Sequence, residues 1–172
     1  MTRTIRSRAL GALLLTLPLA LAACGGGAAN PEEATNAGYA ALGSGDAEAA
    51  VDHFSQALAQ LKPGDKGYKR ARMGEVEAKA RVAPDAAAAS FLDYAKSSPD
   101  QVEAGDYRKV GVQLSERKAY TAAGNVLDAG IQRFPDDAPL REAMDLTIAK
   151  AQQSGDTSAL DALKGLGYVG GD

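Results

Sequence analysis

The chain has 172 residues, with 19 lysines and arginines against 22 aspartates and glutamates, one histidine and one cysteine. Hydrophobic residues make up 45% of it and charged residues 24%, a balance typical of a chain that folds. Alanine accounts for 36 residues, which favours closely packed helices because alanine is the best helix former. The single histidine and single cysteine exclude most metal cages, and they exclude a Cys–His or Ser–His catalytic unit unless His53 serves it.

An export signal is predicted at the start of the chain. Arg3, Arg6 and Arg8 precede an apolar stretch over residues 9–23. This stretch is shorter than the roughly 20 residues that cross a bilayer. A basic start followed by a short apolar segment is typical of a secretory signal peptide.

The signal ends in Leu21-Ala22-Ala23-Cys24, which resembles the lipobox of bacterial lipoproteins at all four positions. The resemblance implies cleavage between Ala23 and Cys24, so that residues 1–23 are a signal peptide, and acylation of Cys24. Several acyl chains together make a stable membrane anchor, and a single cysteine in an exported chain is otherwise an unpaired thiol. The alternatives are a cleaved signal with a free thiol, or an uncleaved hydrophobic anchor.

Residues 24–30 then form a flexible, glycine-rich tether that reaches about 10–15 Å. In the sorting rule of enterobacterial lipoproteins, Gly25 in place of aspartate implies the outer membrane, facing the periplasm. Without residues 1–23 the chain has 16 basic against 22 acidic side chains, a net charge of −6. This charge argues against nucleic acid as a partner.

The rest of the chain repeats. Pro63, Pro99 and Pro135 are spaced by 36 residues, and each is followed within two residues by aspartate. Before each proline, small or apolar residues recur at spacings of four and three, which places them on one face of a helix. They are Ala50, Phe54 and Ala57; Ala87, Phe91 and Tyr94; and Ala123, Leu127 and Gly130. A period in the mid-thirties with paired helices indicates a solenoid.

These units resemble the tetratricopeptide repeat (TPR). The third unit matches best, the first keeps the small and aromatic positions, and the second has Glu75 where glycine is usual. The matching residues are Tyr107, Val110, Gly111, Leu114, Tyr120, Ala123, Leu127, Gly130 and Pro135; Gly38, Ala41, Ala50, Phe54 and Ala57; and Ala71, Gly74 and Ala78. The resemblance implies an all-α fold, a right-handed α-solenoid of about three to four helical hairpins over residues 31–165.

Eight helices are predicted, in the pairs 31–43 with 46–61, 66–81 with 84–97, 100–117 with 119–133, and 137–153 with 157–164. Asn30-Pro31 and Ser98-Pro99 supply a capping residue followed by proline at the first helical position. One face of the seventh helix is expected to cover the open end of the third repeat, because terminal solenoid units need a cover. The Gly-rich tail 166–172 either docks on the last helix pair through Leu166, Tyr168 and Val169 or is offered to a partner.

A candidate binding groove follows from the TPR resemblance, in which the concave surface is lined by fixed positions of the first helix of each pair. The candidates are Tyr39, Leu42, Lys69, Arg72, Val76, Lys79, Arg108 and Val112. Basic residues predominate between positions 62 and 81, so this groove suits an acidic extended or helical segment. The alternatives are a solvated helix face, or a one-residue register shift that presents Tyr68, Ala71 and Glu75 instead.

No enzyme signature is found. His53 is a lone histidine beside the core residue Phe54, and a metal site needs further ligands. The acidic pairs Glu32-Glu33 and Asp136-Asp137 fall at predicted helix starts, where negative charge is favourable. The glycine-rich segments lack the context of a phosphate-binding loop. We therefore expect no catalytic residue, no metal and no cofactor.

The sequence predicts a lipid-anchored adaptor that binds a protein partner in the bacterial cell envelope. The resemblance suggests a part of, or a helper to, a machine for outer-membrane assembly, pilus or secretion-channel assembly, or polysaccharide export. The alternative is a lipoprotein that binds a small acidic ligand or cell-wall fragment in its basic groove, without a protein partner. The oligomeric state is left open.

Overall fold

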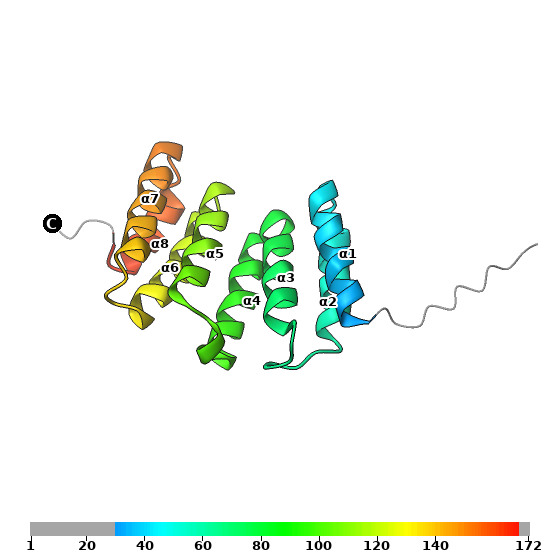
Figure 1. The fold of residues 1–172 in the computed structure, drawn as a ribbon. Coiled ribbons are helices and arrows are strands. Elements are labelled where there is room, and N and C mark those ends of the chain that lie inside the picture. The colour runs from blue at the N-terminus through cyan, green and yellow to red at the C-terminus, as the bar shows by residue number, and fades with distance from the viewer. Residues whose placement is uncertain (1–29, 169–172) are drawn as a thin grey trace, which may run out of the picture.

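A computed structural model of the protein describes residues 30–168, and this part of the chain contains eight α-helices, one short 3-10 helix and no strand (Figure 1). The predicted all-α fold is therefore confirmed for these residues. The elements are α1 (Pro31–Ser44), α2 (Ala47–Leu58), α3 (Tyr68–Val82), α4 (Pro84–Ser97), η1 (Pro99–Gln101), α5 (Ala104–Glu116), α6 (Tyr120–Arg133), α7 (Ala138–Ser154) and α8 (Thr157–Gly165). The predicted signal segment with Ala23, the lipidation candidate Cys24 and residues 169–172 with Val169 lie outside the described residues.

Local capping explains where most helices begin and end. The Asn30 side chain accepts a hydrogen bond from the Glu33 backbone N–H at 2.9 Å, and Pro31 occupies the first helical position. Asp137 accepts in the same way from Leu140. Gly45 and Gly155 end α1 and α7 in the left-handed conformation that glycine adopts without strain. These local signals account for the agreement between predicted and observed helices.

The start of α5 differs from the prediction. Ser98 was expected to cap a helix from residue 100, but its side chain makes no capping bond and the chain forms the 3-10 turn η1. The helix begins instead at Ala104, where the Asp106 carboxylate accepts a hydrogen bond from the Glu103 backbone N–H at 3.0 Å. The Asp106 carboxylate, at the third helical position, satisfies a free backbone N–H at the helix start. The Ser98 side chain makes no such bond, so the later start is the more stable one.

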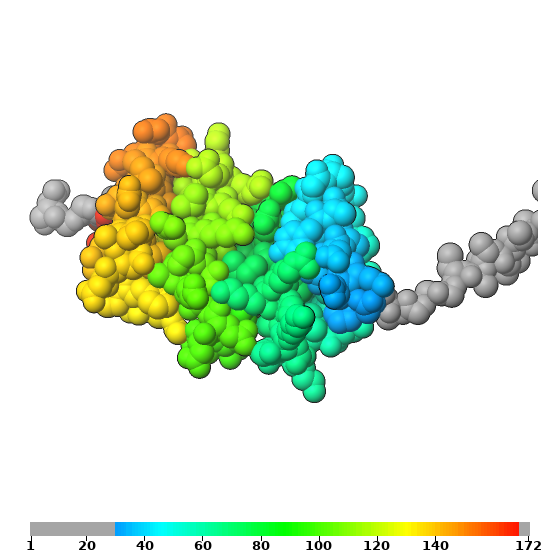
Figure 2. All heavy atoms as spheres, in the orientation of Figure 1, coloured from blue at the N-terminus to red at the C-terminus, as the bar shows by residue number. Residues whose placement is uncertain are grey.

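The helices follow one another across the molecule in chain order, with α1 and α2 at one end and α7 and α8 at the other (Figure 1). Each helix packs against the next along the chain, and α1, α3, α5 and α7 also pack against one another in sequence. These four helices lie in front in Figure 1 and form one broad face of the molecule (Figure 2).

Close helix packing depends on glycine at particular positions. The ring of Phe54 on α2 lies against both Gly38 on α1 and Gly74 on α3, and a Cβ at Gly74 would lie 2.4 Å from the ring. Gly111 on α5 faces Leu127 on α6, where a Cβ would lie 2.5 Å away. Both distances are shorter than any real carbon contact, so a larger residue there would force the helices apart. Glycine at these positions thus lets neighbouring helices approach closely.

The last helices close one end of the core. Leu140, Ala143, Met144 and Thr147 on α7 are buried, as predicted for a covering helix, and Ile148 is partly buried. Leu166 and Tyr168 pack against the same core, and the Tyr168 hydroxyl donates to Asp128 Oδ1 on α6 at 3.0 Å. Burial and this hydrogen bond raise the pKa of Tyr168 to about 12. Leu166 and Tyr168 thus pack on the last helices, which is the docked one of the two alternatives for the tail.

Candidate functional site

Three hollows lie along α1, α3, α5 and α7: one between α1 and α3, one between α5 and α7, and one between α3 and the chain before α5. The hollow between α5 and α7 has a volume of about 470 Å³. Its lining residues are Gly105, Arg108, Lys109, Val112 and Gln113 from α5, and Pro139, Glu142, Ala143 and Leu146 from α7. We call it the α5–α7 hollow.

Apolar side chains are exposed in the α5–α7 hollow. Val112 is 38% exposed and Leu146 is 56% exposed, and among the described residues only Val82 is a further large hydrophobic side chain of comparable exposure. Arg108 beside them makes no ion pair or hydrogen bond with the described residues, whereas Lys109 lies 4.0 Å from Glu77 on α3. An exposed apolar pair next to an unpaired cation is the composition of a surface that a partner can cover.

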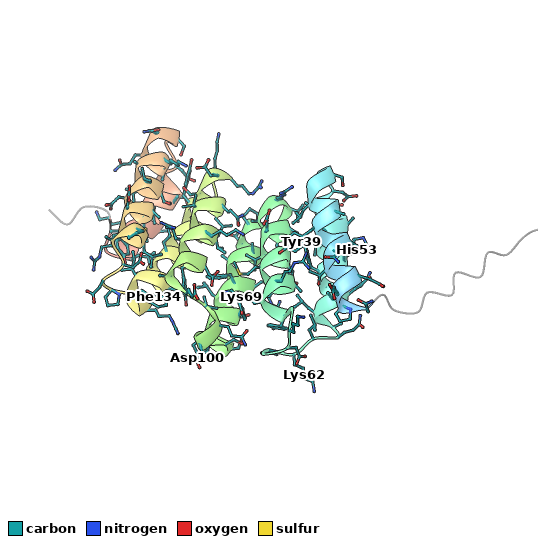
Figure 3. All side chains as sticks on the ribbon, in the orientation of Figure 1. Tyr39, His53, Lys62, Lys69, Asp100 and Phe134 are labelled. Carbon is teal, nitrogen blue, oxygen red and sulfur yellow. The ribbon has the colours of Figure 1, made fainter. Side chains whose placement is uncertain are left out.

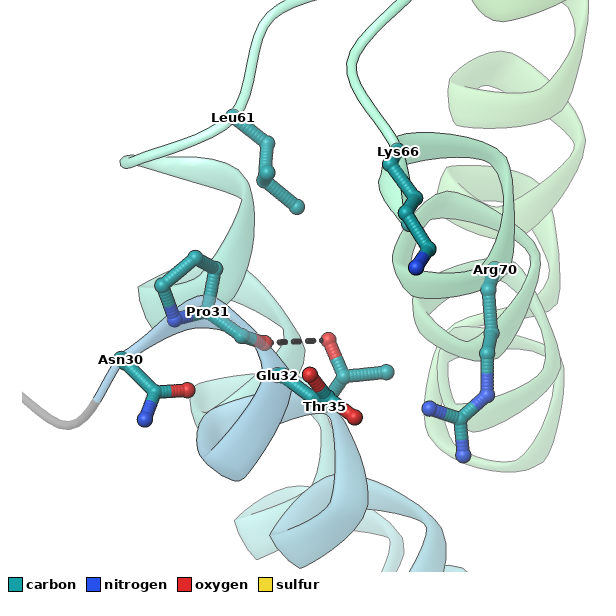
Figure 4. A pocket seen from close by; sticks show the side chains of 8 residues that line it. Asn30, Pro31, Glu32, Thr35, Leu61, Lys66 and Arg70 are labelled. Atoms are coloured by element: carbon teal, nitrogen blue, oxygen red, sulfur yellow. Dashed lines mark hydrogen bonds between the residues drawn. The ribbon is translucent and has the colours of Figure 1, made fainter.

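The second hollow lies between the starts of α1 and α3, and its volume is about 540 Å³ (Figure 4). We call it the α1–α3 hollow; it is lined by Asn30, Pro31, Glu32, Thr35, Leu61, Lys66, Gly67 and Arg70. A third hollow, with a volume of about 650 Å³, lies between the two long connections and is lined by Gly64, Asp65, Gly67, Lys69, Arg70, Met73, Asp100, Gln101 and Glu103. In Figure 3 the labelled Asp100 and Lys62 lie at the lower edge of the molecule, and Lys69 lies above them.

Three of the predicted groove residues line a hollow, and Lys69 is the one that lines the third hollow. Arg108 and Val112 both line the α5–α7 hollow. The prediction missed their counterparts on α7, namely Pro139, Glu142 and Leu146. The sequence contains a spacing that could have identified them, because these residues follow Gly105, Arg108 and Val112 by 34 positions each. The prediction gave α7 only the role of covering the last repeat.

Arg72 and Lys79, predicted to line an open basic groove, do not present free charges on α3, because each pairs with a carboxylate of the same helix. Both are paired with Glu75, through Arg72 Nη1 to Glu75 Oε2 at 2.5 Å and Lys79 Nζ to Glu75 Oε1 at 2.9 Å. Glu75 is only 5% exposed. Arg72 also donates to the Tyr68 hydroxyl, and Lys79 to the Ser90 hydroxyl on α4. We call Arg72, Glu75 and Lys79 the α3 charge cluster.

The α3 charge cluster explains why the pKa of Arg72 is raised. Burial by itself lowers the pKa of Arg72, but the hydrogen bond to Tyr68 and the charge of Glu75 more than compensate, so the pKa of Arg72 is raised. The Arg72 guanidinium therefore stays charged and remains paired with Glu75. Between Tyr68 and Ala80 only Arg70 is exposed, whereas Arg72, Met73, Glu77 and Lys79 are all partly exposed.

The remaining candidates are partly or wholly covered. Leu42 and Val76 are buried in the core and do not line an open surface. Tyr39 is partly buried, packs edge-on against Phe54 at 5.0 Å and donates its hydroxyl to the Arg70 carbonyl at 2.9 Å. Burial raises the pKa of Tyr39. Lys69 is paired with Asp106 at 2.7 Å, so its charge is neutralised within the fold.

The described residues hold no group of three or more His, Cys, Asp or Glu side chains arranged to bind a metal ion. His53 lies on α2, partly exposed. None of the described helices has the length and apolar character needed to cross a membrane.

Comparisons with protein-family models, with curated proteins and with solved structures give no match to this chain.

Proposed function

We propose that this chain is a lipid-anchored adaptor of the bacterial cell envelope, an α-solenoid of TPR-like hairpins that binds a segment of a partner protein. The proposal joins the export and lipidation pattern of residues 1–24 to the row of packed helices. Anchoring raises the local concentration of the adaptor at the membrane, so a modest affinity for the partner is sufficient. The proposed role is binding, not catalysis, at the periplasmic face of the outer membrane.

The observation that carries this proposal is the α5–α7 hollow. Val112 and Leu146 offer apolar contact area there, and Arg108 offers a charge that no described residue neutralises. A partner segment that places a large apolar side chain between Val112 and Leu146 and a carboxylate near Arg108 would satisfy both. Apolar anchors at the centre of an interface with charges at its rim are typical of protein recognition.

The alternative of a small acidic ligand in a basic groove loses its main support. That groove depended on Arg72 and Lys79, and both are neutralised by Glu75. Lys69 is likewise paired, with Asp106.

The test is site-specific photocrosslinking in intact cells. A photoreactive amino acid is placed at Leu146 in the hollow or, as the matched control, at the exposed Thr121 on α6. We expect a protein adduct from position 146, none from position 121, and loss of the adduct when Arg108→Glu is added.

Recovery of the chain without any adduct at position 146 would overturn partner binding in the hollow. The anchor is tested separately with Cys24→Ser, which should leave the protein in the soluble periplasm or as an uncleaved precursor. A processed and membrane-bound Cys24→Ser protein would contradict lipidation.

A further inference from the structure

The α1–α3 hollow lies where the described chain begins. Its wall includes Asn30 and Pro31, the first two described residues, and on the other side Leu61, Lys66 and Arg70 from the α2–α3 connection and α3 (Figure 4). The hollow is distinct from the α5–α7 hollow, which is formed by helices at the opposite end of the row (Figure 1).

Charges of both signs line this hollow without neutralising one another. Lys66 makes no ion pair or hydrogen bond through its side chain with the described residues. Glu32, on the α1 side, is not paired with Lys66 or with Arg70. Two cations on one wall and one carboxylate on the other therefore line the same hollow.

Arg70 is held in position by its neighbours. Its Nη2 donates to Asn36 Oδ1 at 2.9 Å, and its guanidinium lies 4.9 Å from the centre of the Tyr39 ring. Only this one of the five guanidinium N–H donors is used by a described side chain, so several remain for a ligand. An arginine held by its neighbours and an unpaired lysine that line the same hollow suit a phosphate group, which can accept from both.

The opposite wall suits a cation. A phosphate held by Lys66 and Arg70 leaves the Glu32 carboxylate available for an ammonium group of the same ligand. Pro31 and Leu61 supply an apolar border to the hollow. The chemistry that matches is thus a zwitterion that carries a phosphate and a primary ammonium group a few bonds apart.

The position of the hollow indicates the source of such a ligand. Cys24 precedes Asn30 by six residues, and six residues span at most about 20 Å when fully extended. If Cys24 is acylated, as proposed above, the hollow is held within that distance of the lipid head groups. We infer that the α1–α3 hollow binds the phosphoethanolamine head group of a membrane lipid, an inference that rests on the proposed anchor.

The first arm of the test uses a soluble probe and does not depend on the anchor. Phosphoethanolamine is titrated against the full processed chain in non-ionic detergent, and binding is followed by broadening of its phosphorus NMR signal. We expect saturation with the wild type and about tenfold weaker binding for Lys66→Gln with Arg70→Gln, because two charge-assisted contacts are lost. Glu32→Gln should bind phosphoethanolamine no better than inorganic phosphate.

The matched control is Arg117→Ala with Lys164→Ala, which removes two exposed cations on α8 and after α5, outside the hollow. This variant should bind like the wild type, and circular dichroism melting should show all variants folded. Absence of saturation by the wild type, or an equal loss in the control, would overturn the site.

The second arm distinguishes a lipid from a free ligand. The protein is reconstituted into phosphatidylcholine vesicles with or without phosphatidylethanolamine, and amide hydrogen exchange of residues 59–70 is compared. We expect slower exchange for the wild-type protein in vesicles that contain phosphatidylethanolamine. Neither vesicles without this lipid nor the variant with Lys66→Gln and Arg70→Gln should show it. Saturation by free phosphoethanolamine without this protection would overturn the lipid as the source. A Cys24→Ser protein that is still processed and membrane-bound, and still binds free phosphoethanolamine, would overturn the anchor alone.

Discussion

Helices α3 and α5 carry arginines at corresponding repeat positions, yet the two side chains have different environments. Arg72 on α3 and Arg108 on α5 are 36 residues apart, as are Glu75 and Gly111. On α3 the glutamate captures the arginine and a lysine in a buried charge cluster. On α5 the glycine leaves the arginine unpaired in an open hollow. A single residue between two helices thus decides whether a neighbouring cation is structural or available for binding.

The strongest test of this comparison introduces the α3 arrangement into α5. Gly111→Glu would place a side chain where even a Cβ lies 2.5 Å from Leu127. Overpacking together with an imperfectly paired buried carboxylate should cost about 3 kcal/mol or more of unfolding free energy. Urea unfolding measures the loss, and Gly43→Glu, where a Cβ meets nothing within 4 Å, is the control. Equal stability of both variants would show that helix α6 readily moves away from α5.

The reverse change removes the anion from α3. Glu75→Ala leaves Arg72 and Lys79 without their partner, which should cost about 2 to 3 kcal/mol because both cations are partly buried. Glu116→Ala breaks the exposed ion pair with Lys150 and should cost less than about 1 kcal/mol. Thermal and urea unfolding of the two variants compare the pairs directly. Losses of the same size would mean that the α3 charge cluster is no more than a surface feature.

A smaller effect is expected at the docked end of the chain. Tyr168→Phe removes the hydrogen bond to Asp128 and should cost about 1 kcal/mol at neutral pH. Because the folded pKa of Tyr168 is raised to about 12, above the value of about 10 in an unfolded chain, its contribution is complete below pH 10. It is lost as the pH rises from 10 to 12. Stability measured across this range should fall more steeply for the wild type than for Tyr168→Phe, and parallel curves would contradict the assigned contact.

The smallest effect on stability is expected for Arg108→Glu. Its side chain is exposed and makes no ion pair with the described residues, so unfolding free energy should change by less than about 0.5 kcal/mol. Arg72→Glu, the matched change on α3, should destabilise the fold strongly because it opposes Glu75 with a second carboxylate. The melting temperatures of the Arg108→Glu and Arg72→Glu variants distinguish a residue of a binding surface from a residue that stabilises the fold. A large loss for Arg108→Glu would assign this residue to the fold and not to a binding surface.

Much of the secondary structure could be predicted from short-range features. Asn30-Pro31, Asp137 and the glycines at 45 and 155 act on amide groups within a few residues of themselves. The start of α5 could not, because Ser98-Pro99 and Asp106 are competing local signals and their relative strength depends on the surroundings. There, Asp106 accepts from Glu103 and from Lys69 on α3, and this long-range partner favours the later start.

The candidate site was predicted only in part, for a related reason. Arg108 and Val112 were identified by counting positions within a repeat, and both line an open hollow. The same counting failed on α3, since it assumed that every repeat presents the same face. On α3, Arg72 and Lys79 are paired with Glu75 of the same helix and Val76 is buried, so these residues do not present free groups on an open surface.

The sequence by itself determined the all-α fold, the helix order and the small positions at which helices meet. These follow from propensity, capping and a period of about 36 residues, all of which act within one or two helices. Only the tertiary structure decided which cations remain free, because an ion pair depends on the rotation of a helix about its axis and on partners from other helices. A rotation of one residue, about 100°, leaves helical periodicity intact but moves a side chain from an open hollow to a buried contact.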